Sequence, residues 1–173
     1  MSGRRHLVLV GGGHAHVQVL TAFRDRPVEA AVTLISEAPD TPYSGMLPGC
    51  VAGLYSREEI HIDLAALARS AGVPFVLGRA VGLDRVNRRV VLEGAEPVPY
   101  DVISLDIGIR PDLSGIAGAE HHAVAVKPIA GFLDRFDRLM GAALTTGGPR
   151  RIAVIGGGPA GVELALAIRA RLH

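Results

Sequence analysis

Two glycine-rich segments carry the residue types and spacing that could hold a phosphate. The first is Gly11-Gly12-Gly13-His14-Ala15-His16, and the second is Gly156-Gly157-Gly158-Pro159-Ala160-Gly161. Each follows a short apolar run and precedes a helical pattern, which predicts a strand, a tight turn and a helix. Such a turn directs backbone N–H groups and a helix N-terminus at a pyrophosphate. Two copies therefore predict two dinucleotide sites, and two dinucleotides suggest electron transfer between them.

The first copy departs from the dinucleotide-binding pattern at its third glycine position. Gly11 suits the tight turn and Gly13 suits the close approach of backbone to phosphate. His16 stands where a glycine normally lets the helix pack tightly on the strand. Ser36 ends the next expected strand and Glu37 follows it, and either side chain could bind a ribose hydroxyl.

The second copy matches the pattern fully. Gly156, Gly158 and Gly161 occupy all three glycine positions, with Pro159 and Ala160 between them. Glu163 follows in what we expect to be the first turn of the last helix, where the helix dipole favours a carboxylate. The first copy, taken alone, also fits an ordinary glycine-rich turn of an α/β protein. A single-nucleotide dehydrogenase would leave the second copy unexplained.

Hydrophobic periodicity predicts the elements that position these turns. Continuous apolar runs predict buried parallel strands, and three- and four-residue spacing predicts amphipathic helices. The expected strands are 6–10, 31–36, 74–77, 100–105 and 151–155. The expected helices are 14–24, 64–70 and 132–140. A hairpin of 78–84 with 89–92 is expected to turn near Asn87. Asp63 and Gly72 are the expected cap and stop of the helix over 64–70. Residues 38–56 and 109–128 are expected to be irregular.

Composition excludes several classes of function. The net charge of +1 and 4% aromatic content give no basis for nucleic-acid binding. No run approaches the roughly 20 apolar residues that span a bilayer. A single cysteine, Cys50, offers no disulfide or dithiol pair, so we expect a cytoplasmic protein. His14 and His16 would lie on opposite sides of a helix, so no metal site is expected.

Further motifs between the two glycine segments carry a family resemblance. The block Tyr100–Pro111 resembles Tyr-Asp-x-Leu-x-x-Ala-Thr-Gly-Ser-x-Pro of the pyridine nucleotide–disulfide oxidoreductase superfamily, with Asp106-Ile107-Gly108 in place of Ala-Thr-Gly. Gly78-x-Ala80-x-x-Leu83-Asp84 resembles a strand that lies by the adenine. No Cys-x4-Cys pair occurs near residues 40–50. The start of the chain and Thr41–Gly49 resemble type II NADH dehydrogenase and, more closely, the flavoprotein fused to selenide, water dikinase.

The resemblance implies a fold, two cofactors and a set of contacts. The fold is α/β: a Rossmann-like FAD-binding domain with a parallel sheet and a β-hairpin or meander insertion, then the first β-α unit of a Rossmann-like NAD(P)-binding domain. The implied boundaries are 1–112, a crossover over 113–149, and 150–173. FAD is implied at the first fingerprint and NAD(P)H at the second, with Glu163 beside flavin and nicotinamide. The remaining implied cofactor contacts are Gly45, Met46, Leu47, Pro48, Ala80, Asp106, Ile107, Gly108 and Arg110.

Two functions remain open from the sequence. The first is hydride transfer from NAD(P)H to FAD, with electrons passing on to a quinone or another small-molecule acceptor. The second is a truncated or stand-alone flavin-binding module without turnover, because the resemblance covers only the N-terminal half of a family member. The missing half or a partner would then cover exposed apolar side chains of the last helix, and a full-length relative could sit peripherally on a membrane. Neither the acceptor, the choice of NADH or NADPH, nor the oligomeric state can be inferred.

Overall fold

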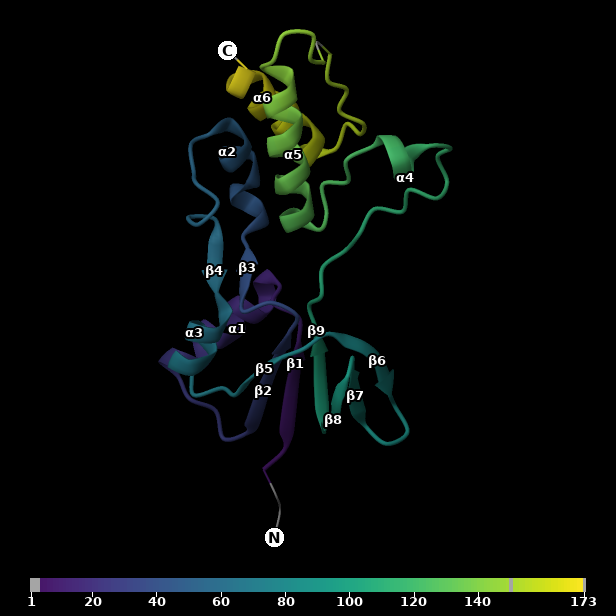
Figure 1. Cartoon of the computed structure of the whole chain (residues 1–173). Coiled ribbons are helices and arrows are strands. Elements are labelled where there is room, and N and C mark those ends of the chain that lie inside the picture. Colours follow the sequence, from purple (N-terminus) through teal and green to yellow (C-terminus); the bar gives the residue numbers. More distant parts are fainter. Residues whose placement is uncertain (1–3, 150, 173) are drawn as a thin grey trace. The chain divides into compact units, whose positions relative to one another are not determined.

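The computed structural model describes residues 4–149 and 151–172 and divides the chain into two compact units (Figure 1). Unit 1 comprises Met1–Thr41 and Ile62–Gly108, and unit 2 comprises Pro42–His61 and Ile109–His173. Each unit has its own hydrophobic core. The functional boundaries at residues 112 and 149 stay a prediction.

A four-stranded parallel sheet forms the centre of unit 1. Its order is β5 (Phe75–Leu77), β2 (Ala31–Ser36), β1 (His6–Val10) and β9 (Val102–Leu105). Val10 pairs with Ile35 on one side and with Leu105 on the other. The carboxyl ends of β1, β2 and β9 therefore meet at one edge of the sheet, where ligands bind in open α/β folds.

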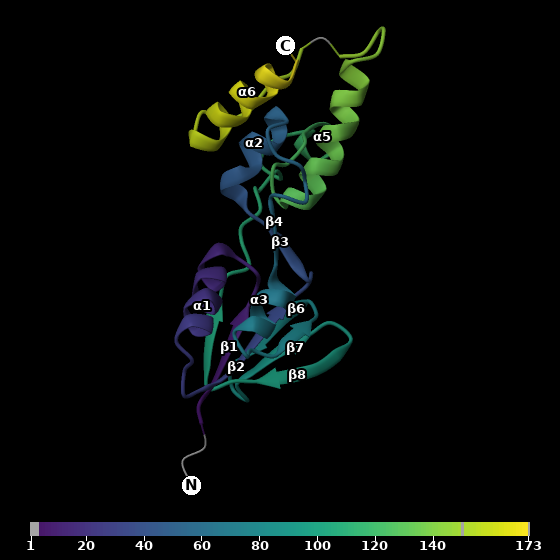
Figure 2. The same ribbon diagram turned by 90° about the vertical axis from the view of Figure 1, so that its left-hand side faces the viewer.

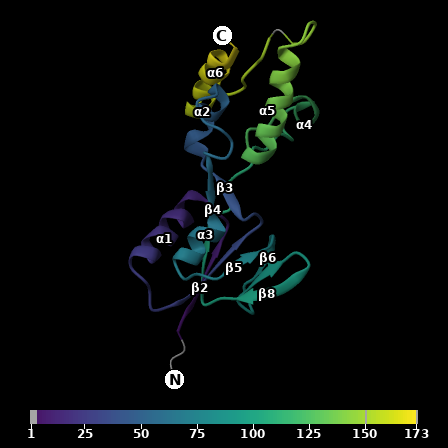
Figure 3. The same ribbon diagram turned by 60° about the vertical axis from the view of Figure 1, so that its left-hand side comes forward.

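Successive side chains of β1 point to opposite faces of this sheet, so they show what packs on each face. Leu9 packs in a core with α1 (His14–Asp25) and α3 (Leu64–Ser70), whereas Val8 and Val10 pack against Val90 and Leu92 of the second sheet. Figure 3 shows α1 and α3 on one side of the parallel strands and the second sheet on the other. Both faces are buried, which explains the continuously apolar strand sequences.

The second sheet of unit 1 is the predicted insertion. It is an antiparallel meander of β6 (Ala80–Asp84), β7 (Arg89–Leu92) and β8 (Ala95–Pro99). Asp84 closes the first turn by accepting hydrogen bonds from the backbone N–H groups of Val86 and Asn87 and from Asn87 Nδ2. The backbone N–H of Asn87, more than any other group, holds the pKa of the Asp84 carboxyl below its ordinary value. The hairpin predicted near Asn87 is confirmed.

The short helix of unit 1 is capped as its sequence predicts. Asp63 Oδ1 accepts a hydrogen bond of 2.8 Å from the backbone N–H of Ala66. Gly72 follows the helix with a φ of +66°, a conformation that favours glycine. Before this helix, β3 (Asp40–Pro42) and β4 (His61–Asp63) form a two-stranded sheet.

Unit 2 consists of helices around an apolar core. It contains the 3-10 turn η1 (Ser44–Met46), α2 (Leu47–Ala52), α4 (Ala119–His122), α5 (Ile129–Ala143) and α6 (Pro159–Leu172). Figure 2 shows α2 between α5 and α6. The core contains Leu47 and Val51 of α2, Phe132 and Phe136 of α5, and Leu164 of α6. The rings of Phe132 and Phe136 are stacked, with their centroids 5.7 Å apart. No helix among the described residues is both long and apolar enough to cross a membrane.

Two local expectations for unit 2 were wrong. Residues 38–56 are not wholly irregular, because Pro48 lies in the first turn of α2, where its missing N–H costs no hydrogen bond. Residues 151–155 form no strand. A strand needs a neighbour for its backbone hydrogen bonds, and no strand of the described residues pairs with this segment.

Candidate functional site

The turn between β1 and α1 lies at the carboxyl edge of the sheet, beside the end of β9. The backbone N–H of Gly11 donates to the carbonyl oxygen of Ile35 at 2.8 Å, and that of Gly13 donates to the carbonyl oxygen of Asp106 at 3.0 Å. Gly11 has a φ of +96°, and a Cβ there would collide with the Asp106 carbonyl. This glycine is therefore required by the fold itself.

The three glycines of the turn have different neighbours. A Cβ at Gly12 would collide with the Leu64 side chain, so Gly12 allows α3 to pack against the turn. A Cβ at Gly13 would collide with the carboxyl group of Asp106. Gly13 has an ordinary φ of −67°, so only the space beside it demands glycine. The space beside Gly13, where close approach of a phosphate is predicted, holds the carboxyl group of Asp106.

Asp106 also supplies the cap that α1 lacks in its own sequence. Gly13 is the N-cap residue and has no side chain to accept a hydrogen bond. Asp106 Oδ2 instead accepts one from the backbone N–H of His16 at 3.1 Å. A carboxylate at this position is stabilised by the positive end of the helix dipole. The N-terminus of α1 therefore already binds an anionic group.

His16, at the third glycine position, fixes the helix to the sheet. Its side chain is only 1% exposed, with Nδ1 2.7 Å from the carbonyl oxygen of Gly11 and Nε2 2.9 Å from Ser104 Oγ. Because a carbonyl oxygen only accepts, Nδ1 carries a proton; a neutral ring then accepts from the Ser104 hydroxyl at Nε2. The sequence identified this departure from glycine, but it gave no signal that the histidine would join β1, α1 and β9.

Ser36 and Glu37, the two residues predicted to bind a ribose, differ in their exposure. The Ser36 side chain is buried, and its Oγ accepts a hydrogen bond of 3.4 Å from the backbone N–H of Ala38. Glu37 is exposed and lies 3.8 Å from Arg79, whose guanidinium is also 3.7 Å from Glu93. Arg79 is a residue that the sequence reasoning missed. A ribose role for Glu37 stays a prediction.

The second glycine segment has the turn geometry without the strand. Gly156 has a φ of +112°, and a Cβ at Gly161 would collide with the Gly156 carbonyl, so Gly161 allows the helix to approach the turn. A Cβ at Gly158 would meet open space. Pro159 begins α6, where its fixed φ suits the first helical position. Glu163 is exposed and lies in the second turn of α6, not in the first as expected.

The remaining predicted cofactor contacts fall in both units. In unit 1, His14 and Ala15 are exposed in the first turn of α1, Ile107 and Gly108 follow β9 in an exposed segment, and Ala80 is half-buried in β6. In unit 2, Gly45 and Arg110 are exposed, Met46 and Pro48 are half-buried, and Leu47 is buried in the helical core. The flavin contacts predicted for the segment 43–49 stay a prediction.

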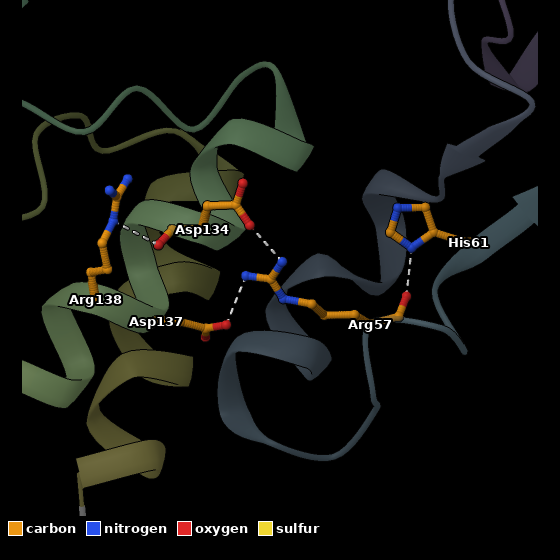
Figure 4. A network of polar contacts seen from close by, with 5 residues as sticks. All are labelled: Arg57, His61, Asp134, Asp137 and Arg138. Atoms are coloured by element: carbon orange, nitrogen blue, oxygen red, sulfur yellow. Dashed lines mark hydrogen bonds and ion pairs between the residues drawn. The ribbon is translucent and has the colours of Figure 1, made fainter.

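An ion-pair network holds the segment after α2 to α5 within unit 2 (Figure 4). Arg57 donates to Asp134 Oδ1 and to Asp137 Oδ2, each at 2.7 Å. The hydrogen bond that Arg57 donates to Asp134 is the largest cause that raises the pKa of Arg57. The carbonyl oxygen of Arg57 also contacts His61 Nδ1. Arg138 Nε donates to the backbone carbonyl of Asp134 at 3.2 Å.

Cys50 lies in α2 as a free, half-buried thiol. Burial is the main cause that raises its pKa above the ordinary value, and Asp137 adds to the shift, while Arg57 and Arg171 oppose it. A thiol of raised pKa carries less of the reactive thiolate at neutral pH.

We therefore expect Cys50 to react slowly with a thiol reagent such as iodoacetamide at pH 7. Its rate should climb through a higher pH range than that of free cysteine, because the thiolate forms later. Mass-spectrometric labelling across pH measures this. A rate at pH 7 equal to or above that of free cysteine would contradict the raised pKa.

Two other features do not provide a cofactor site. An open hollow of about 450 Å³ in unit 2 is lined mainly by apolar side chains such as Ile152 and Val154, with Arg169 at its wall. Within residues 4–149 and 151–172, no group of three His, Cys, Asp or Glu residues could hold a metal ion.

Comparison with known protein families shows to which family this chain belongs. The family model for pyridine nucleotide-disulphide oxidoreductases matches residues 5–172. The chain belongs to this family. The superfamily that the fingerprints resemble is thereby confirmed, and FAD and NAD(P)H are the cofactors of pyridine nucleotide-disulphide oxidoreductases.

Curated relatives are longer than the chain. It is 24% identical over 167 residues to the NADH dehydrogenase-like protein YutJ of Bacillus subtilis, covering 95% of the chain and 45% of the relative. It is 29% identical over 168 residues to the ferredoxin–NAD(+) reductase component of the anthranilate 1,2-dioxygenase system of Burkholderia cepacia, covering 94% and 39%. The chain thus spans less than half the length of these two family members.

Solved structures of similar proteins confirm the fold. Reduced CoADR-RHD of Bacillus anthracis superposes with a TM-score of 0.80 at 21% identity, over 98% of the chain and 31% of that structure. NDH2 of Plasmodium falciparum, solved in complex with NADH, superposes with a TM-score of 0.73 at 19% identity, over 95% and 36%. These likenesses show the α/β fold that the sequence predicts for the family.

Proposed function

We propose that this chain is the dinucleotide-binding part of an FAD-dependent NAD(P)H oxidoreductase. In this proposal the turn Gly11–Gly13 holds the pyrophosphate of FAD, and Gly156–Gly161 contacts that of NAD(P)H. The observation that carries the proposal is the first turn, where a helix N-terminus and closely packed glycines already bind a carboxylate at the carboxyl edge of a parallel sheet. Family membership over residues 5–172 supports it.

The residues around the first turn fit a flavin dinucleotide. The backbone N–H groups of the first turn of α1 can donate to phosphate oxygens once the Asp106 carboxylate is withdrawn. Glu37 can accept from ribose hydroxyls, and Arg79 beside it can keep its carboxylate oriented. FAD supplies the hydride and electron chemistry when it is bound, while the protein positions it and excludes water.

We extend the proposal to the electron path as the family suggests. Electrons enter from NAD(P)H with the dinucleotide at the second turn and Glu163 near the nicotinamide. They leave to a small-molecule acceptor such as a quinone. A cytoplasmic location, with peripheral membrane contact in a longer form, belongs to the same proposal.

Absorbance of the purified chain tests the first part of this proposal. We expect bound flavin to absorb near 450 nm after reconstitution and gel filtration, and acid release to yield FAD rather than FMN. Reconstitution with NAD⁺ serves as the control ligand. A chain that retains NAD⁺ but no flavin would contradict the assignment of the first turn to FAD.

A second candidate function, flavin binding without turnover, is favoured by one observation. Residues 151–155 form no strand, so the second glycine turn is not anchored to a sheet within the described residues. Such a turn can contact a pyrophosphate locally. It is poorly suited to hold a nicotinamide at the roughly 3–3.5 Å from the flavin that hydride transfer requires.

We therefore predict that the 173-residue chain does not sustain NAD(P)H oxidation by itself. The flavin-loaded chain is mixed anaerobically with excess NADH, and the flavin absorbance is followed. We expect bleaching to be slow and to show no saturation with NADH. Rapid bleaching at sub-millimolar NADH would contradict the prediction, and dithionite serves as the control that the bound flavin can be reduced.

A further inference from the structure

The Asp106 carboxylate lies beside Gly13 at the first glycine turn, on the side from which a phosphate is expected to approach the backbone. It accepts a hydrogen bond from the backbone N–H of His16 in the first turn of α1. It also fills the space where a Cβ of Gly13 would lie. Dinucleotide-binding turns keep that space clear so that the phosphate can approach the backbone.

The second glycine turn of the same chain provides the internal comparison. Gly158 corresponds to Gly13, and a Cβ at Gly158 would meet nothing within 4 Å. The two turns therefore differ in what stands beside this glycine: no strand of the described residues pairs with the segment before Gly158, whereas the Asp106 side chain lies beside Gly13. In the family block that Tyr100–Pro111 resembles, the same position holds an alanine, which could not fill the space.

We propose that Asp106 is a displaceable occupant of the first phosphate site, stabilising α1 in the ligand-free chain and leaving when a dinucleotide binds. The inference rests on the proposed function, because it needs a pyrophosphate at this turn. A carboxylate and a pyrophosphate cannot share one set of donors, since like charges in contact repel strongly away from bulk water. Asp106 is only half-buried, so its side chain has room to rotate outward.

The backbone and the side chain of Asp106 have different roles at the first turn. The backbone holds the turn in place, and the carboxyl group occupies the space beside Gly13. The backbone of Asp106 stays fixed, because its N–H donates to the Val10 carbonyl at 2.8 Å and its carbonyl accepts from Gly13 at 3.0 Å. The His16 ring holds the same junction through Gly11 and Ser104. Only the carboxyl group needs to move. Asp106 thus lowers dinucleotide affinity while it keeps the empty turn ordered.

Asp106→Asn is the decisive variant, because it removes the charge and keeps an oxygen that can accept from His16. FAD and ADP are titrated into the flavin-free full chain by calorimetry. We expect Asp106→Asn to bind both ligands roughly tenfold more tightly, because the charge repulsion is gone. The matched control is Asp101→Asn, since Asp101 also accepts a backbone hydrogen bond, from His6 at 2.7 Å, at the opposite end of β1. The affinity of Asp101→Asn for FAD and for ADP should equal that of the unmodified chain.

The outcomes separate this inference from the proposed function. Equal FAD affinity in the unmodified chain and Asp106→Asn would overturn the role of Asp106 and leave the proposed function standing. Weaker binding by Asp106→Asn would also overturn it, since the carboxylate would then be a direct ligand. A gain for FAD without one for ADP would place the effect at the flavin and overturn the assignment to phosphate. No binding of FAD by any variant would refute both proposals.

Thermal unfolding supplies a readout that needs no measured affinity. Without ligand, Asp106→Asn should melt below the unmodified chain, because the neutral amide loses the favourable interaction of a negative charge with the helix dipole. The rise in melting temperature on adding FAD should be larger for Asp106→Asn. A smaller rise would contradict the displacement.

Discussion

Gly13→Val should abolish flavin retention while the chain remains folded. Gly13 has φ −67° and ψ 170°, which valine adopts without strain, and its new side chain would push only against the movable carboxyl end of Asp106. The valine methyl groups would then stand where a phosphate must approach the backbone. We expect at least a hundredfold loss of FAD affinity, about 2.7 kcal/mol, because the phosphate contacts cannot form.

The measurement is flavin content after reconstitution, together with far-ultraviolet circular dichroism. Gly115→Val is the matched control, because a Cβ at Gly115 would meet open space. It should retain flavin as the unmodified chain does. Gly11→Val is the contrasting variant, and it should lose the fold, because a Cβ there meets the Asp106 backbone at a φ of +96°. Unchanged flavin content in Gly13→Val would exclude the first turn as the flavin site.

His16→Leu should destabilise unit 1 more than any surface change on the same helix. Leucine has a similar volume but cannot hydrogen-bond, so the Gly11 carbonyl and the Ser104 hydroxyl would lose their partner at a buried position. Leaving two buried polar groups unsatisfied costs about 2–4 kcal/mol in the free energy of unfolding.

Urea unfolding followed by circular dichroism measures this loss. Gln18→Leu, an exposed change on the same helix, is the control and should alter the free energy of unfolding by less than about 0.5 kcal/mol. A loss for His16→Leu no larger than that of the control would show that the histidine merely fills space. His16→Gly, which restores the family pattern, should also be destabilising, since it removes both hydrogen bonds and opens a cavity.

The sequence predicted the central elements of unit 1 because their signals are local. Continuous apolar runs marked β1 and β2, and Asn87 marked the hairpin turn. Strand β8 was missed, since Pro97 and Pro99 argue against a strand. It pairs only with β7, at the edge of the meander, where a missing N–H is tolerated.

What the sequence could not predict depends on contacts between distant residues. The glycine spacing located both turns, yet the side chain that lies beside Gly13 comes from Asp106, which follows β9 far along the sequence. Burial of His16 likewise depends on Ser104. Residues 151–155 have the sequence of a strand, but a strand exists only when a neighbour accepts its hydrogen bonds.

The hydrogen bonds that complete the first glycine turn have a consequence for the order of synthesis. His16 meets Ser104 and Asp106 across 88 and 90 residues of sequence. The ribosome therefore synthesises the residues of the first turn, of α1 and of the whole meander before those of β9 and Asp106, which supply the last hydrogen-bond partners of the turn and of α1. Meander contacts are local and can form early, whereas the phosphate-binding turn has to wait for β9. The dinucleotide binding that we propose for this turn therefore requires that most of unit 1 has been translated.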